Sequence, residues 1–133
     1  ARAGALVGVA MQAEHDDPAE RQRAPVLAVL DGEQLRVPEG APTMAGYGAD
    51  IAVSGDGGFA VSGSRAGRVL RWRADRGFDT VAELRQAGAL AASPDGGLLV
   101  AAERGIGHWH SRGSAALLRW PAAVALDNHW RVL

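Results

Sequence analysis

The feature that most constrains the fold of this chain is a pair of matching segments 39 residues apart. Residues 51–61 read Ile-Ala-Val-Ser-Gly-Asp-Gly-Gly-Phe-Ala-Val, and residues 90–100 read Leu-Ala-Ala-Ser-Pro-Asp-Gly-Gly-Leu-Leu-Val. In each copy a Ser-x-Asp-Gly-Gly turn joins two apolar runs. Glycine supplies the positive φ of a tight hairpin, and the aspartate accepts backbone N–H groups of its own turn. The pattern therefore predicts two β-hairpins related by an internal repeat.

Short strands are predicted along almost the whole chain. Short apolar runs alternate with Gly, Asp, Pro and Ser, and helical periodicity is nearly absent. One alternative stays open, because residues 79–87 also fit a short helix. We expect strands at roughly 5–12, 26–31, 34–38, 49–54, 58–63, 68–73, 79–85, 88–92, 97–103, 106–110, 115–120 and 122–126.

The spacing of the repeat predicts a β-propeller, because four strands in about 40 residues form one propeller blade. Two further strands follow each hairpin, and the first of them carries Trp72 in one unit and Trp109 in the other. We expect both indoles to be largely buried between blades. The predicted fold is all-β, a β-propeller fragment of about three four-stranded antiparallel blades. The blade units are approximately 1–48, 49–86 and 87–121, with 122–126 starting a closing strand.

Three blades do not close a propeller ring, since closed propellers have four to eight. The chain also starts with Ala1 directly before an apolar run. These features predict that upstream sequence is missing and that the first unit lacks its first strand.

Composition excludes several classes of function. The 133 residues carry a formal net charge of −1, which gives no electrostatic reason to expect a nucleic-acid partner. The absence of cysteine excludes disulfides, cysteine-ligated zinc and thiol catalysis. No apolar run reaches the roughly 18 residues of a membrane-spanning helix, so no transmembrane segment is predicted.

Two His-containing pairs are candidate metal ligands. His108 and His110 are two residues apart on a predicted strand, so their imidazoles share one face. Asp127 and His129 have the same spacing near the C-terminal end. Three imidazoles and a carboxylate suit Zn²⁺, Cu²⁺ or iron, if the fold brings the pairs together. The alternatives are an exposed polar strand face for the first pair and a structural turn for the second.

Two charged segments are given structural interpretations. Arg71 and Arg73 share one face of a predicted strand and Trp72 takes the other, so we expect the arginines to face solvent and the indole to face a neighbouring blade. The acidic residues 14–17 lack the ligand positions of an EF-hand loop, and a solvated loop is favoured over a Ca²⁺ or iron site.

Several motifs resemble an uncharacterised family of proteobacterial periplasmic propellers whose members end in Trp-Asp-Asn-His. Asp127-Asn128-His129 is similar to that ending, with Leu126 in the position of the tryptophan. The resemblance spans nearly the whole chain and corresponds to the last third of a family member. It implies a seven-bladed, exported propeller in the periplasm, associated with iron-uptake components such as imelysin-like peptidases and haem peroxidases. It carries over no catalytic residue. Residues 44–48, 64–72 and 12–25 also resemble family segments.

The favoured interpretation is a non-enzymatic periplasmic binding or scaffold module, which the resemblance links to iron or metal acquisition. Its expected partners are a periplasmic protein or small ligand and the remaining blades of the same propeller; its cofactor is unknown. The alternative is a propeller enzyme with a metal- or quinone-dependent site at the central channel, supplied mostly by missing blades. The expected inner strands offer Asp50 and Asp127 at their ends and otherwise small apolar side chains, which argues against an elaborate channel site.

Overall fold

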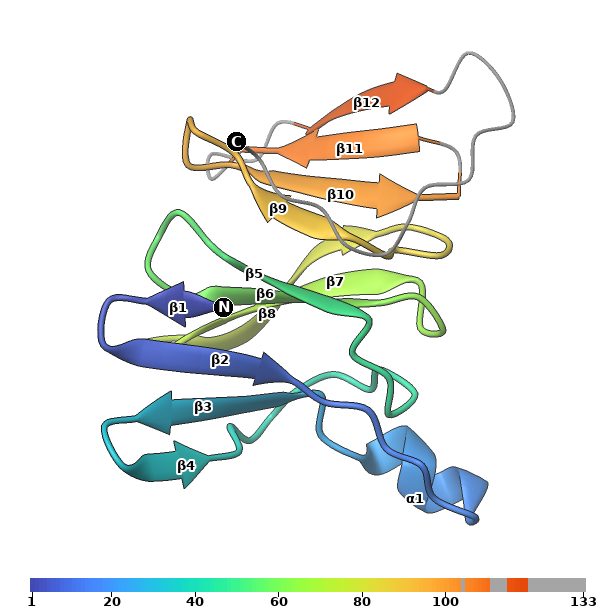
Figure 1. Ribbon diagram of the computed structural model, residues 1–133. Helices are drawn as coiled ribbons and strands as arrows, with labels where there is room; N and C mark the ends of the chain where they lie inside the picture. Colours follow the sequence, from blue (N-terminus) through green and yellow to red (C-terminus); the bar gives the residue numbers. More distant parts are fainter. Residues whose placement is uncertain (104, 111–114, 120–133) are drawn as a thin grey trace.

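The described part of the chain forms three four-stranded antiparallel sheets that stack one on the next, as the computed structural model shows (Figure 1). The structure describes residues 1–103, 105–110 and 115–119. Within each sheet the strands follow chain order, each pairing with the next. The prediction of an all-β fold with about three such sheets is confirmed.

The sheets have the following bounds. The first contains β1 (Arg2–Ala3), β2 (Leu6–Ala10), β3 (Leu27–Asp31) and β4 (Gln34–Arg36). The second contains β5 (Asp50–Val53), β6 (Phe59–Gly63), β7 (Arg68–Arg73) and β8 (Gly77–Glu83). The third contains β9 (Leu90–Ala92), β10 (Leu98–Ala102), β11 (Gly105–Trp109) and β12 (Ala115–Arg119). The expected closing strand at 122–126 lies outside the described residues.

The structure decides two strand assignments that the sequence left open or predicted wrongly. The first sheet does have a first strand, so the expectation that it lacks one was wrong: Gly4 turns the chain at a φ of 59°, and Arg2 pairs with Val7. Residues 79–83 belong to β8, which pairs with β7, so the strand interpretation of this segment is confirmed over the helical one.

One short helix, α1 (Pro18–Arg23), lies in the loop between β2 and β3 (Figure 1). The side chain of Asp17 caps it by accepting a hydrogen bond from the backbone N–H of Ala19 at 2.8 Å, and Pro18 occupies its first turn. The sequence does not reveal this helix, because none of its residues is buried and it therefore carries no apolar stripe.

The two repeated turns form the same backbone hydrogen bonds. The N–H of Ser54 donates to the Gly58 carbonyl at 2.9 Å, and the N–H of Ser93 donates to the Gly97 carbonyl at 2.9 Å. The turns also approach each other closely, since a Cβ on Gly55 would lie 2.3 Å from the Gly96 carbonyl oxygen. The repeat in sequence is thus a repeat in structure.

Apolar side chains fill both gaps between the sheets. Between the first and second sheets the core contains Val26, Leu27, Val29, Met44, Phe59, Val61 and Leu70. Between the second and third sheets it contains Ala52, Ala60, Val69, Ala82, Ala87, Leu90, Leu98 and Val100. The second sheet therefore buries apolar side chains on both faces, because adjacent residues of a strand point to opposite sides.

The two repeat tryptophans are half-buried, so the expectation that both are largely buried was too strong. Trp72 packs at the edge of the core between the first and second sheets, and Trp109 at the edge of the next core. Phe59 takes the central position instead: it is fully buried, with its ring centroid 6.3 Å from that of Trp72 and the two rings nearly parallel.

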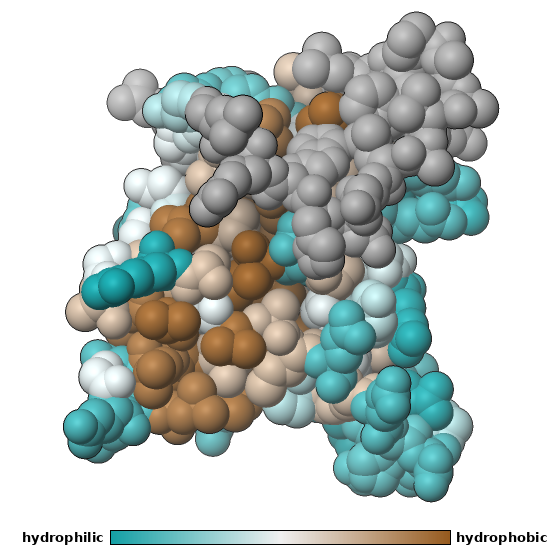
Figure 2. All heavy atoms as spheres, in the orientation of Figure 1, coloured by the Kyte–Doolittle hydropathy of each residue, from teal (hydrophilic) through white to brown (hydrophobic). Residues whose placement is uncertain are grey.

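Exposed large apolar side chains gather on the first sheet. They are Val9, Leu35 and Val37, the last directly after β4. Figure 2 shows hydrophobic residues at the lower left, where β2 to β4 lie in Figure 1. Within the described part of the chain, no helix is long and apolar enough to cross a membrane.

Candidate metal centre

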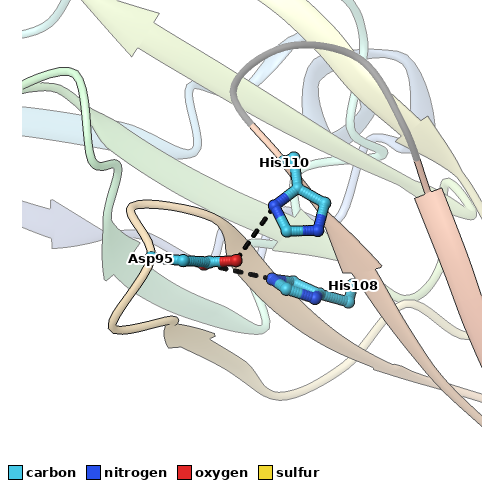
Figure 3. A group of neighbouring side chains, drawn as sticks. All are labelled: Asp95, His108 and His110. Carbon is cyan, nitrogen blue, oxygen red and sulfur yellow. Dashed lines mark hydrogen bonds and ion pairs between the residues drawn. The ribbon is translucent and has the colours of Figure 1, made fainter.

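Asp95, His108 and His110 come together at one edge of the third sheet (Figure 3). The Nδ1 atom of His110 lies 2.9 Å from one Asp95 carboxylate oxygen, and the Nε2 atom of His108 lies 3.3 Å from the other. The two imidazole centroids are 4.1 Å apart. One ligand atom from each residue can be chosen so that all three lie within 4.8 Å of one another.

The hairpin between β9 and β10 and the alternation along β11 create this cluster. Leu98 pairs with Trp109, so the turn that precedes β10 lies beside the end of β11. His108 and His110 flank Trp109 and point to the face opposite the indole. Trp109 packs into the core that faces the second sheet, which leaves both imidazoles on the other face of the third sheet.

Gly97 provides the space that the cluster needs. A Cβ at this position would lie 2.7 Å from the Nε2 atom of His108 and 2.8 Å from the carbonyl oxygen of Trp109. The second glycine of the Ser-x-Asp-Gly-Gly turn therefore lets the turn approach β11 closely, in addition to the positive φ of 80° that Gly96 provides.

The turn holds Asp95 in its ionised form. The hydrogen bond from the Ser93 hydroxyl, followed by that from the Gly97 N–H and by His108, lowers the pKa of Asp95 to about 2. The Gly97 nitrogen lies 3.0 Å from the carboxylate oxygen. Asp95 is thus a carboxylate at neutral pH, the form that a metal ion requires of this ligand.

The cluster offers two imidazole nitrogens and a carboxylate, a donor set that suits zinc, copper or ferrous iron. The side chains of Asp95 and His110 are 43% and 40% exposed, so an ion could reach them from solvent. Three protein ligands leave at least one coordination position for water or another molecule.

The predicted ligands fare differently. His108 and His110 share a face, as expected from their spacing. Asp127 and His129 lie outside the described residues. Asp95 was not among the predicted ligands, because its place in the repeat indicated only a role in the turn. Extending the β10–β11 pairing by one residue past Leu98 and Trp109 places Gly97 opposite His110, which brings the turn that contains Asp95 beside the histidines.

Arg71 and Arg73 do not face solvent, so that expectation was wrong. Their side chains are only 21% and 16% exposed, because the third sheet covers the face of the second sheet from which they project. They form ion pairs with Asp56, at 3.2 Å and 2.7 Å respectively. Trp72, on the opposite face, packs toward the first sheet.

The acidic segment at residues 14–17 has local, exposed hydrogen bonds. Asp17 caps α1, and Arg21 donates to the backbone carbonyl of His15 at 2.7 Å. These contacts fix the local conformation of the segment.

Residues 2–133 match the family described as "Protein of unknown function (DUF1513)". The chain belongs to this family. No match to a curated protein was found.

Solved structures of other proteins have a fold similar to that of this chain. Virginiamycin B lyase from Staphylococcus aureus, in its selenomethionine form, aligns with a TM-score of 0.63 at 12% identity, over 78% of this chain and 37% of the lyase. The catalytically inactive H270A form, with quinupristin, aligns with a TM-score of 0.60 at 13% identity, over 72% and 34%. A streptogramin B lyase structure aligns with a TM-score of 0.60 at 12% identity, over 73% and 34%. The chain spans about a third of each of these structures, and the likeness shows a propeller-like fold.

Proposed function

We propose that this DUF1513 chain is a non-enzymatic propeller module that binds a divalent transition-metal ion through Asp95, His108 and His110. The convergence of three ligand atoms within 4.8 Å carries the proposal. The turn and the register of β10 and β11 already position the three side chains, so binding needs little reordering. The Asp95 carboxylate is ionised, and neutral imidazole nitrogens have the lone pair that a metal accepts.

The setting of the proposal is periplasmic, with a link to iron or metal acquisition, and it rests on the family resemblance of the Asp127-Asn128-His129 ending. A periplasmic protein or small ligand is the proposed partner. Further sheets of the same propeller are a second partner, for which the exposed side chains of Val9, Leu35 and Val37 offer an apolar surface.

Binding is favoured over catalysis by the strands expected to line the propeller axis. In the described part of the chain, β5 and β9 present Asp50 at the start of β5 and otherwise apolar side chains such as Ala52 and Leu90. The carboxylate of Asp50 accepts hydrogen bonds from the backbone N–H groups of Ile51 and Leu90, which gives it a structural role. The identity of 12–13% to the lyases supports a shared fold alone, so their activity is not transferred.

Zinc titration of the purified protein tests the proposal. We expect calorimetry to show one zinc ion per chain, with Mg²⁺ failing to compete because it prefers oxygen ligands. His108→Ala and His110→Ala should each weaken zinc binding by roughly 100-fold, at least as much as loss of a supporting residue around a metal site.

His15→Ala is the matched control, since this exposed histidine lies in the loop before α1, away from the third sheet. Zinc affinity should not change in this variant. Wild-type affinity in both His108→Ala and His110→Ala would show that the cluster is not the site.

Gly97→Ala gives an independent test that keeps every ligand. The added methyl group would lie 2.7 Å from the Nε2 atom of His108 and should displace that ring, lowering zinc affinity by about tenfold or more. Gly58→Ala is the control, because Gly58 occupies the same position in the turn of the second sheet and contacts Trp72 and Arg73. Calorimetry should find unchanged zinc affinity in Gly58→Ala; equal losses in the two variants would contradict the assignment.

A further inference from the structure

The metal cluster has a counterpart in the second sheet. There the turn aspartate, Asp56, lies 3.2 Å from the Nη1 atom of Arg71 and 2.7 Å from the Nη1 atom of Arg73. In the third sheet, the turn aspartate contacts His108 and His110. One Asp-centred arrangement thus occurs twice, with different residues from the neighbouring strand.

Strand register shows that these positions are equivalent. Phe59, the first residue of β6, pairs with Trp72, and Leu98, the first residue of β10, pairs with Trp109. Arg71 and His108 each precede the tryptophan of their strand, and Arg73 and His110 each follow it.

The turn serine plays the same role in both copies. The Ser54 hydroxyl donates to Asp56 at 2.5 Å, and the Ser93 hydroxyl hydrogen-bonds to Asp95. Burial acts to raise the pKa of Asp56, but the Ser54 hydrogen bond and the charges of Arg71 and Arg73 outweigh it and leave this pKa below its usual value. Each turn therefore presents an ionised carboxylate to the two residues that flank the tryptophan.

The two arrangements differ in charge. Two guanidinium groups form ion pairs with the carboxylate of Asp56. Arg71 also donates two hydrogen bonds, of 2.5 Å and 3.1 Å, to the carboxylate of Asp79 on the paired strand β8. Guanidinium has no lone pair to give to a metal. In the third sheet imidazoles replace both arginines, and Ala116 stands opposite His108 where Asp79 stands opposite Arg71. A divalent ion could supply there the positive charge that the arginines supply in the second sheet.

We infer that the two residues flanking the tryptophan determine what the Ser-x-Asp-Gly-Gly turn binds. Two arginines form ion pairs that join the turn to the strand, whereas two histidines make the turn a site for a divalent transition metal. The inference rests on the proposed function and assigns its specificity to a pair of positions. It also predicts that the two kinds of site can be exchanged.

The double variant Arg71→His/Arg73→His tests the exchange in one direction. Zinc calorimetry should find two zinc ions per chain in place of one, because Asp56 and the two new imidazoles reproduce the third-sheet donor set. Adding Asp56→Asn to this variant should weaken the second site by roughly tenfold or more. A stoichiometry of one, in a variant whose far-ultraviolet circular dichroism matches wild type, would overturn the inference.

The reverse variant, His108→Arg/His110→Arg, tests the exchange in the other direction and does not depend on the folding of the first variant. It should lose zinc binding and yet keep the melting temperature of the metal-free wild type, since arginines form ion pairs with the equivalent turn in the second sheet. His108→Ala/His110→Ala is the matched comparison, and it should lose zinc and melt at a lower temperature. Wild-type zinc affinity in the arginine variant, or melting as low as that of the alanine variant, would contradict the inference.

The outcomes separate the two proposals. If wild-type protein binds zinc and the Arg-to-His exchange adds no site, the inference fails and the proposed function stands. If wild-type protein binds no zinc, the proposed function itself fails, and the inference fails with it.

Discussion

Phe59→Ala is expected to lower the free energy of unfolding by about 3–5 kcal/mol, the range for removing a large buried aromatic side chain. Phe59 is fully buried, between the first and second sheets. Its ring packs so closely on β2 that a Cβ at Gly8 would lie 2.7 Å from two of its atoms. Because the backbone there is held by strand pairing, the sheets cannot easily collapse into the cavity that the variant leaves. Chemical denaturation monitored by circular dichroism measures the loss.

Leu35→Ala is the matched control for this stability measurement. Leu35 also lies on the first sheet, in β4, but its side chain is 65% exposed. We expect a change within about 0.5 kcal/mol, as is usual at surface positions. If Phe59→Ala cost no more than Leu35→Ala, the packing of the first sheet on the second would be wrong.

Asp56→Asn should have the second-largest effect, a loss of about 2 kcal/mol in the free energy of unfolding. The change keeps the size of the side chain but removes the charge that Arg71 and Arg73 face. The side chains of these three residues are 16–23% exposed. Leaving buried charges without a partner costs about 3–5 kcal/mol and exposed pairs contribute about 0–1 kcal/mol, so partly covered groups fall between these values. Asp95→Asn is the equivalent change in the third sheet, and urea denaturation of metal-free protein should show a smaller loss for it, because imidazoles replace the arginines.

The same pair of proteins gives a pH test. Because the pKa of Asp56 is lower in the folded chain than its ordinary value of 3.8, its carboxylate contributes stability above that value. This contribution is lost as the pH falls through the folded-state pKa. The stability difference between wild type and Asp56→Asn should therefore be constant near neutral pH and shrink below about pH 4. A difference that grew on acidification would contradict the ion-pair network.

The sequence alone determined the features that depend on local chemistry. The Ser-x-Asp-Gly-Gly turns and the short apolar runs between them were enough to predict the hairpins, most of the strands and an all-β fold of about three sheets, because turn geometry and strand alternation involve residues close in the chain. The shared face of His108 and His110 follows from the same alternation.

Only the tertiary structure decided what depends on register and on the stacking of sheets. Asp95 joins the two histidines because β10 pairs with β11 in one particular register. The arginines of β7 are covered because the third sheet stacks on the second, and Phe59 is buried more deeply than either repeat tryptophan. An apolar or charged residue has the same periodicity whether its strand face meets another sheet or water, so burial and long-range ion pairs become visible only once the sheets are placed.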